Sequence, residues 1–159
     1  MNLAEKLAAA LREADRHTDT LSEALAEWDR SPATGWQTLE ADRGRVRLVD
    51  QLLFRFIKLQ DAVGERLVPA TLAALEEPYE DWVMRDRLNR LEKLGYLDVD
   101  DWLAWREVGN GLALEYPDQP ELRFAVLLAA IDAAHALAAL YRLWRTRLRS
   151  AGILTSSPA

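Results

Sequence analysis

The chain has 159 residues, of which 50% are hydrophobic and 29% charged, and its formal net charge at pH 7 is -6. This length suits one folded domain with a single core, and the negative charge argues against a strongly basic, indiscriminate nucleic-acid binder. The absence of cysteine excludes disulfides, thiolate metal sites and cysteine nucleophiles, and it fits a reducing compartment.

Two segments bear on targeting and membrane insertion. The N-terminal residues, MNLAEKLAAALREADRH, mix charged and apolar side chains, so they lack the continuous apolar stretch of a signal peptide. The longest apolar run, residues 124–141, contains Asp132 and His135 and does not reach the ~20 residues of a membrane span. We therefore expect a cytoplasmic protein with no membrane segment.

The first two predicted helices are long. Apolar residues recur at steps of three and four over residues 3–28, which is the pattern of a helix with one buried face. The stretch DRSPATGW that follows is typical of a turn. A second helix is predicted over residues 38–75, and Gly64 and Pro69 are expected to bend or divide it.

Turn and capping residues delimit the helices that follow. The stretch EEPYED precedes a third helix over residues 81–94, which ends at the C-cap residue Gly95. Asp98 is a suitable N-cap for the fourth helix. This helix should stop before Pro117, because the residue ahead of a proline disfavours helical geometry.

The last helix is the most apolar. It opens at Asp118 or Gln119, continues to about Arg149, and is apolar on nearly every side from Phe124 to Leu140. Such a helix lies at the centre of a bundle or is also covered by a partner chain. We favour the central position and keep a homodimer as the second possibility.

Together these segments predict an all-α fold, an up-and-down bundle of about five helices joined by short loops. Residues 1–150 form its single domain, and residues 151–159 are predicted to be a frayed, disordered tail. The sequence contains no evident internal repeat or low-complexity segment.

The two histidines offer little for catalysis. His17 lies among charged residues and is predicted to be a solvated surface residue, whereas His135 lies in DAAHALAAL and is predicted to be a core residue. Neither has a sequence-local partner for acid–base chemistry. No convincing zinc-ligand spacing and no glycine-rich phosphate loop occurs, so we expect no cofactor and no metal.

Charged side chains gather in three places. Lys58, Gln60 and Asp61 form a polar patch. Lys58 and Asp61 could pair on the surface for only ~0.2–0.5 kcal/mol, or the patch could face the fourth helix across the bundle. Two arginine clusters are expected to be solvated helix faces, and they would contact phosphate only if both lined one groove. Their members are Arg43, Arg45 and Arg47, and Arg142, Arg145, Arg147 and Arg149.

The segment WREVGNGLALEYPDQPE, which begins at Trp105, resembles the signature of HEPN-domain proteins, in particular toxins of the HepT type. Members commonly read R-E-x-R-N-x-x-x-H-x-Y, followed by proline. The stretch FRFIKLQDAVGERLVP also resembles the long second helix of that group. The residues that match the signature are Arg106, Glu107, Asn110, Glu115, Tyr116, Pro117 and Asp118.

The resemblance implies a HEPN-like helical bundle that forms a homodimer and cuts RNA without a metal. In the family, an arginine and a histidine, separated by four to six residues, come from both subunits to one cleft. Histidine can move protons near neutral pH, and arginine can hold the phosphate and stabilise its developing charge. An asparagine beside the arginine, here Asn110, can orient these groups.

This chain departs from the signature at both chemical positions. Gly109 stands where the family arginine is expected and Leu114 where the histidine is expected, while Arg106 is the outer arginine of the signature. Leucine transfers no proton and glycine holds no phosphate. We therefore predict a HepT-like toxin of a type VII-like toxin–antitoxin module that has lost its ribonuclease activity. The sequence offers no packing reason for Gly109.

Tyr116 keeps its place in the signature. By resemblance it is the acceptor to which a minimal nucleotidyltransferase antitoxin transfers AMP, and the added charge would block RNA at the cleft. The alternative is a tyrosine that packs at a helix end before Pro117. Two other classes stay open: a non-catalytic HEPN module that binds a nucleotide or a partner protein, and a helical adaptor with no nucleic-acid role.

Overall fold

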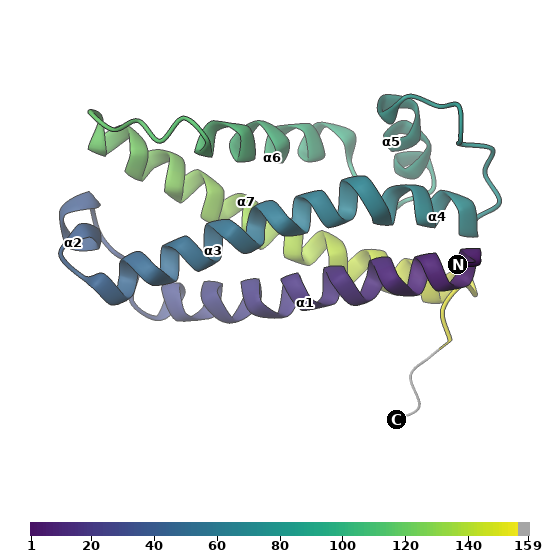
Figure 1. Cartoon of the computed structure of the whole chain (residues 1–159), viewed down its shortest axis with the longest axis horizontal. Coiled ribbons are helices and arrows are strands. Elements are labelled where there is room, and N and C mark those ends of the chain that lie inside the picture. Colours follow the sequence, from purple (N-terminus) through teal and green to yellow (C-terminus); the bar gives the residue numbers. More distant parts are fainter. Residues whose placement is uncertain (156–159) are drawn as a thin grey trace.

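Four long helices, each antiparallel to the long helix before it, form the body of the molecule in the computed structural model, which describes residues 1–155 (Figure 1). Every regular element among these described residues is a helix, so the predicted all-α fold is confirmed. The four long helices are α1 (Leu3–Arg30), α3 (Arg43–Asp61), α6 (Val99–Leu112) and α7 (Pro120–Ser150).

The segment predicted as one second helix is divided, so that prediction is wrong in its extent. The carboxylate of Asp42 accepts hydrogen bonds from the N–H groups of Gly44 and Arg45, and this N-cap starts a new helix. A short helix therefore precedes α3, and a π-helix follows it. The elements over this segment are α2 (Trp36–Glu40), α3, the π-helix η1 (Ala62–Leu67) and α4 (Val68–Ala74).

The π-helix lies where Trp102 of α6 packs against the chain. Gly64, in the middle of η1, is buried, and a Cβ atom built on it would lie 3.2 Å from Cζ2 of Trp102. The glycine therefore lets the indole ring approach the backbone closely. The sequence predicts a bend or division at Gly64 and Pro69; instead the helix geometry changes from α to π over Ala62–Leu67 and returns to α at Val68 without a gap.

The predicted punctuation before α6 is confirmed. The short helix α5 (Met84–Lys93) lies at the end of the bundle beside α4 (Figure 1). Gly95 follows it with φ of +86°, the left-handed conformation of a helix C-terminus. Asp98 caps α6, since its carboxylate accepts the N–H of Asp101 at 2.9 Å.

The core is densest around the C-terminal half of α7. The Trp144 side chain is fully buried, donates from Nε1 to Oγ1 of Thr71 at 3.0 Å, and lies 5.3 Å from the ring of Tyr96. The Tyr141 hydroxyl donates to the Leu11 carbonyl at 3.0 Å. Buried aromatic rings with satisfied polar atoms contribute both area and orientation to a core.

α7 packs against α1, α2, α3 and α6, but it is not covered on every side as a central helix would be. It is also the one helix among the described residues that is long and apolar enough to cross a membrane by length and composition alone. The core helix of a bundle passes the same test, and 44% of the most apolar window of α7 is buried by its neighbours. One face stays open, with Leu122, Leu128 and Leu143 exposed.

The first residues of the predicted tail fold back on the bundle. Gly152 has φ of +75° after the end of α7, and the N–H of Ile153 donates to the Leu148 carbonyl at 3.0 Å. Ile153 and Leu154 then pack against the core. The rest of the predicted tail, residues 156–159, lies outside the described residues.

Candidate functional site

The signature segment begins on a weakly buried helix. Of the 14 residues of α6, only Val99 and Trp102 are buried, and both lie in its first turns. A 14-residue helix has little stability of its own in water, so its position depends on contacts with its neighbours. The C-terminal half of α6, which carries the signature, is held by a small set of specific contacts described below.

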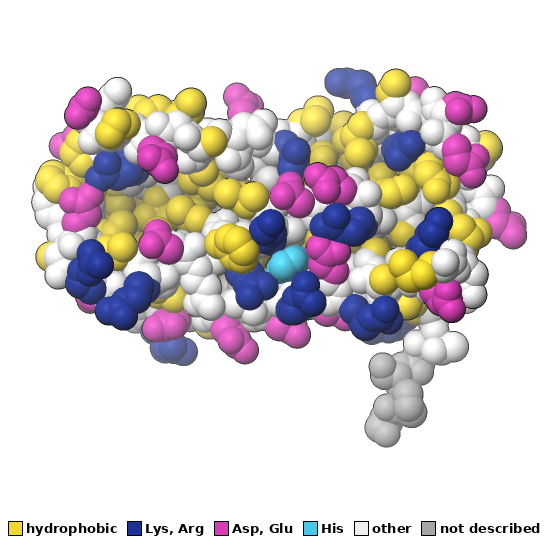
Figure 2. All heavy atoms as spheres, in the orientation of Figure 1, with side chains coloured by type: hydrophobic (Ala, Val, Ile, Leu, Met, Phe, Trp, Pro, Cys, Tyr) yellow, Lys and Arg dark blue, Asp and Glu magenta, His cyan; other side chains and the backbone are white. Residues whose placement is uncertain are grey.

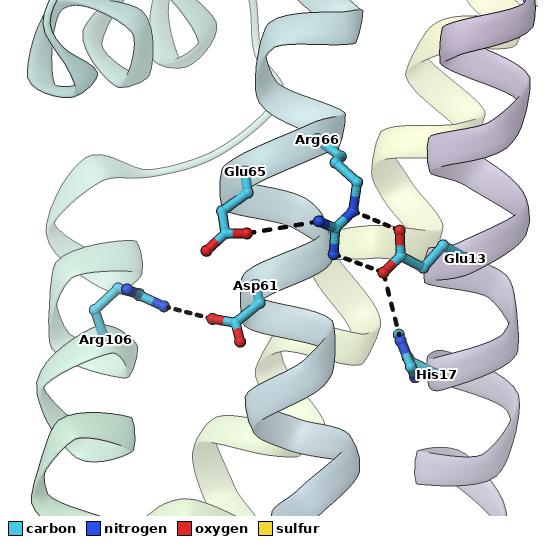
Figure 3. A network of polar contacts seen from close by, with 6 residues as sticks. All are labelled: Glu13, His17, Asp61, Glu65, Arg66 and Arg106. Atoms are coloured by element: carbon cyan, nitrogen blue, oxygen red, sulfur yellow. Dashed lines mark hydrogen bonds and ion pairs between the residues drawn. The ribbon is translucent and has the colours of Figure 1, made fainter.

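The polar patch of α3 faces α6, which confirms one of its two predicted roles. Nε2 of Gln60 donates to the Trp105 carbonyl at 2.7 Å, and Nη1 of Arg106 lies 3.4 Å from Oδ1 of Asp61 (Figure 3). Lys58 instead lies over the ring of Phe54, 5.6 Å from its centroid. Gln60 is 2% exposed, so its hydrogen bond is a buried link between the two helices.

Gly109 has a packing reason in the folded chain, which the sequence alone did not offer. A Cβ atom built on Gly109 would lie 2.6 Å from Oε1 of Gln60, closer than real side-chain contacts allow. Gln60 is buried and bonded to Trp105, and it therefore cannot move away freely. The glycine permits the approach of α6 to α3, and an arginine at this position would collide with the Gln60 amide.

The chain leaves α6 earlier than Pro117 requires. The helix ends at Leu112, and Glu115 and Tyr116 adopt positive φ values of 58° and 44°. The Tyr116 N–H donates to the Leu114 carbonyl at 2.7 Å, so the loop is a tight turn. Left-handed conformations at non-glycine residues are uncommon and mark a turn that its surroundings hold in place.

The five residues predicted to form the site are not gathered in one place. Arg106 and Gly109 face α3, whereas Asn110 and Leu114 are exposed, Leu114 with 64% of its surface accessible. Tyr116 is half-buried and lines a pocket with other loop residues. Within one subunit the signature therefore marks a helix contact, an exposed edge and a pocket wall.

The pocket is the main hollow at this end of the molecule. It has a volume of about 430 Å³, within the size range of small-molecule sites, and α2, α3 and the segment from the end of α6 into α7 form its walls. Figure 2 shows hydrophobic side chains gathered in a hollow at the left end of the molecule, where α2, α3 and the α6–α7 loop meet in Figure 1. Its apolar lining residues are Trp36, Leu39, Val46, Val49, Leu53, Leu112, Pro117, Pro120, Phe124, Val126 and Leu127.

Five polar side chains complete the lining. Glu40 and Arg123 form an ion pair that joins the residue ending α2 to the first turn of α7. Asp50 and Glu115 are exposed members of the lining, and neither has an ion-pair partner among the described residues. With Tyr116, these groups place excess negative charge at the edge of an apolar space.

Both histidines lie away from this pocket, and both predictions about them are wrong. His17 is only 6% exposed, because it falls on the same face of α1 as the buried leucines. Its Nδ1 accepts a hydrogen bond from Arg55 at 2.9 Å, and its Nε2 points toward Glu13 at 3.8 Å (Figure 3). His135 lies on the open face of α7, with Nε2 3.1 Å from Oδ2 of Asp29.

Burial shifts the protonation of His17. Burial first, and then the positive charges of Arg55 and Arg16, lower the pKa of the imidazole, while Glu13 opposes them. The neutral form accepts from Arg55 and keeps its proton on Nε2. This histidine is therefore a packed structural group linked to the Glu13–Arg66 pair, whose two hydrogen bonds measure 2.5 and 2.6 Å.

The two arginine clusters do not line one groove. The first lies at the start of α3 and the second at the end of α7, at opposite ends of the bundle in Figure 1. Several members are also engaged within the fold. Arg145 binds the Asp15 carboxylate at 2.8 Å, and Arg45 donates to Ser31 at 2.9 Å. The condition for a joint phosphate-binding role is not met in this chain.

Sequence patterns missed the charged residues of the pocket. Asp50 and Arg123 each lie within an ordinary helical pattern, and only the folded chain brings them together with Trp36 of α2. No spacing along the sequence could have identified them. Among the described residues, no group of three or more histidine, aspartate or glutamate side chains could hold a metal ion.

Comparisons with models of protein families, with curated proteins and with solved structures find no match to this chain. The resemblance of residues 105–121 to the HEPN signature therefore stays a prediction, and any function has to be argued from the geometry of the chain itself.

Proposed function

We propose that this chain is a HEPN-like protein of the HepT toxin lineage that does not cut RNA and acts by binding a partner of the minimal nucleotidyltransferase class in the cytoplasm. The observation that carries the loss of activity is the packing of Gly109. Position 109 faces the buried Gln60 amide, so the helix contact is built for a glycine and not for a phosphate-binding arginine.

The overall arrangement supports the lineage part of the proposal. The chain is a bundle of antiparallel helices, and the signature lies at the end of α6, immediately before the long helix α7. The signature residue Arg106 projects toward α3, the helix whose sequence also resembles the family. Tyr116 follows in the turn between α6 and α7.

The absence of acid–base chemistry supports the non-catalytic part. Leu114 is exposed and carries no proton. Neither histidine lies in the lining of the pocket, since His17 is held by Arg55 and His135 pairs with Asp29. RNA cleavage through the 2′-hydroxyl needs a group that moves protons near neutral pH, and this segment lacks one.

Tyr116 supports a partner that acts on the loop. Its side chain is half-buried at the pocket, and the turn that presents it carries two left-handed residues. Transfer of AMP to its hydroxyl would add a phosphate beside Glu115, and the resulting repulsion would open or reorganise the loop. In the proposal this modification alters partner binding, because there is no RNA cleavage to block.

We also propose that two copies of the chain form a homodimer. The open face of α7 exposes Leu122, Leu128 and Leu143 to 39%, 41% and 66% of their surfaces. A two-fold contact through this face would cover them. Sedimentation equilibrium of the wild type and of Leu128→Glu with Leu143→Glu tests this, with a dimer expected for the first and a monomer for the second.

An RNA-cleavage assay tests the main proposal. Purified wild-type protein incubated with total RNA in EDTA should yield no fragments above a protein-free control. The proposal fails if the wild type cuts RNA and Arg106→Ala abolishes that cutting. A triple variant restores the signature residues with Gly109→Arg and Leu114→His, and Gln60→Ala makes room for the new arginine. RNA cleavage by this variant would indicate a toxin that has lost its activity. A folded variant that does not cleave RNA would indicate a HEPN-like module that was never catalytic.

A nucleotidyl-transfer assay tests the partner. After incubation with a minimal nucleotidyltransferase and ATP, peptide mass spectrometry should find one AMP on Tyr116 and none on the buried Tyr96 and Tyr141. The matched control is Tyr116→Phe. AMP on another residue, or none at all, would contradict the proposed role of Tyr116.

A further inference from the structure

The pocket between α2, α3, the α6–α7 loop and α7 has a composition that selects a ligand, whether or not the chain belongs to the HEPN group. Aromatic rings from three of these segments, those of Trp36, Tyr116 and Phe124, lie in the lining. Aliphatic side chains and prolines supply most of the remaining wall. Such a space of about 430 Å³ favours an apolar molecular body.

Gly111 is the second observation. It lies in the last turn of α6, one residue before the helix ends at Leu112. Gly109 on the same helix is explained by its contact with Gln60, but a Cβ atom on Gly111 would meet no atom within 4 Å. Gly111 lines the pocket, and because it has no side chain the pocket has more space at this point. No contact in the described fold requires a glycine at this position.

The charge of the lining is the third. Three carboxylates and one guanidinium line the space, and the guanidinium of Arg123 is already paired with Glu40. Asp50 and Glu115 have no ion-pair partner within residues 1–155, so they give the rim an uncompensated negative charge. A phosphate or carboxylate ligand would be repelled there, and a cation would be attracted.

We propose that this pocket binds a small organic cation, an apolar molecule that carries one ammonium or guanidinium group. The apolar body occupies the space beside Gly111, and the cationic group lies at the rim near Asp50 and Glu115. The aromatic rings of the lining add to the attraction, since a cation over the face of an aromatic ring is stabilised by its quadrupole. This ligand class differs from the nucleotides and RNA that the HEPN resemblance suggests.

Three probes with the same body test the ligand class at pH 7: 2-naphthylmethylamine, which is cationic, 2-naphthalenemethanol, which is neutral, and 2-naphthoate, which is anionic. Affinities are measured by titration followed by amide chemical shifts, which also locate the site. We expect the cation to bind at least tenfold more tightly than the anion, with the alcohol between them. Shifts should centre on the pocket residues.

Two variants test the two parts of the site separately. A Cβ atom at position 111 meets no atom within 4 Å, so Gly111→Leu should place its side chain in the open space and weaken all three probes at least tenfold without loss of thermal stability. Asp50→Asn with Glu115→Gln should bring the cation and the anion to within about threefold of each other and leave the affinity of the alcohol unchanged. Leu103→Ala, an exposed position of α6 outside the lining, is the matched control.

Three outcomes would overturn the inference. The first is no saturable binding of any probe, and the second is equal binding of cation and anion by the wild type. The third concerns Gly111→Leu. Unchanged affinities would mean that the probes do not bind in this pocket, and conversion of a wild-type dimer into a monomer in sedimentation would mean that the pocket binds a second copy of the chain. These results are independent of the RNA-cleavage and AMP-transfer assays, so failure here leaves the proposed function standing.

Discussion

The two ends of the bundle are held together in different ways. At the end where α4, α5 and the C-terminal half of α7 meet, Trp144 is fully buried and its indole nitrogen is bonded to Thr71. At the other end, the C-terminal half of α6 has no buried residue, and a pocket lies beside the core residues Val49 and Leu127. There Trp105, Val108 and Leu112 are only partly buried against the core, and the Gln60 amide links α3 to α6 beside Gly109.

This difference indicates that the most buried side chains and the proposed binding residues lie at opposite ends of the bundle. Apolar contacts are non-directional and roughly additive in area, so they make one end resistant to opening. A helix held by few buried side chains opens locally at lower free energy, and binding segments are commonly drawn from such regions. The signature segment and the pocket both lie at the weakly packed end.

The largest effect is expected in the dense core. Trp144→Ala should lower the free energy of unfolding by about 3–5 kcal/mol, because it removes a large buried side chain and leaves Thr71 without its partner. Arg149→Ala, at an exposed position near the end of the same helix, should change it by less than about 0.5 kcal/mol. Urea denaturation followed by circular dichroism measures both. Similar values for the two variants would contradict the dense packing described for this end.

The next effect separates the two glycines of α6. Gly109→Ala introduces a collision with Gln60 and Gly111→Ala does not, and the change in their difference on Gln60→Ala isolates that collision. We expect Gly109→Ala to be less stable than Gly111→Ala by about 1–3 kcal/mol, the usual cost of overpacking. Urea denaturation compares them, and repeating both changes on Gln60→Ala should remove most of the difference. A difference that survives in the Gln60→Ala background would show that another contact is responsible.

The same two glycines mark the limit of sequence reasoning. The all-α class and the caps Asp98 and Gly95 followed from periodicity and local backbone chemistry, which act over a few neighbouring residues. Gly109 could not be understood in that way, because its reason is a side chain 49 positions earlier on another helix.

The candidate site was harder to predict than the fold. The resemblance singled out Tyr116, which does line the pocket, but the charged rim depends on Asp50 and Arg123 from other helices. The histidines were misplaced for a related reason. Charged neighbours suggested exposure for His17, whereas the helical phase of α1 turns its ring toward the core and leaves those neighbours outside.

A smaller effect should follow the protonation of His17. Its pKa is lowered in the folded protein, so the folded state binds the proton less readily than the unfolded state, whose histidine titrates near 6.5. Stability is therefore complete above about pH 6.5 and is lost as the pH falls from there toward the folded-state pKa, with a slope below ~1.4 kcal/mol per pH unit. Urea denaturation from pH 7.5 to 5 should show this loss.

The control for this titration is a second histidine substitution. His17→Gln should flatten the loss of stability between pH 6.5 and 5, whereas His135→Gln, on the open face of α7, should leave it in place. If His17→Gln loses as much stability as the wild type between pH 6.5 and 5, the carboxylates of the bundle cause the loss and the buried imidazole does not.

The smallest effect compares two arginines that join helices, both drawn in Figure 3. Arg66 makes two hydrogen bonds to Glu13 at 2.5 and 2.6 Å, whereas Arg106 makes one contact of 3.4 Å to Asp61. Their side chains are similarly exposed, at 46% and 42%, so solvent screens both pairs and geometry decides between them. Exposed pairs are worth ~0.2–1 kcal/mol, and two-point contacts lie at the upper end of that range.

Arg66→Gln should therefore destabilise the protein by up to about 1 kcal/mol and Arg106→Gln by a few tenths, measured by urea denaturation at 20 mM salt and again at 500 mM salt. The loss in Arg66→Gln should shrink at high salt. A larger loss of stability in Arg106→Gln than in Arg66→Gln would mean that an ion pair holds α6 firmly on α3. That result would contradict the weak packing described for this end of the bundle. A small loss would mean that the single contact between Arg106 and Asp61 contributes little to the position of α6.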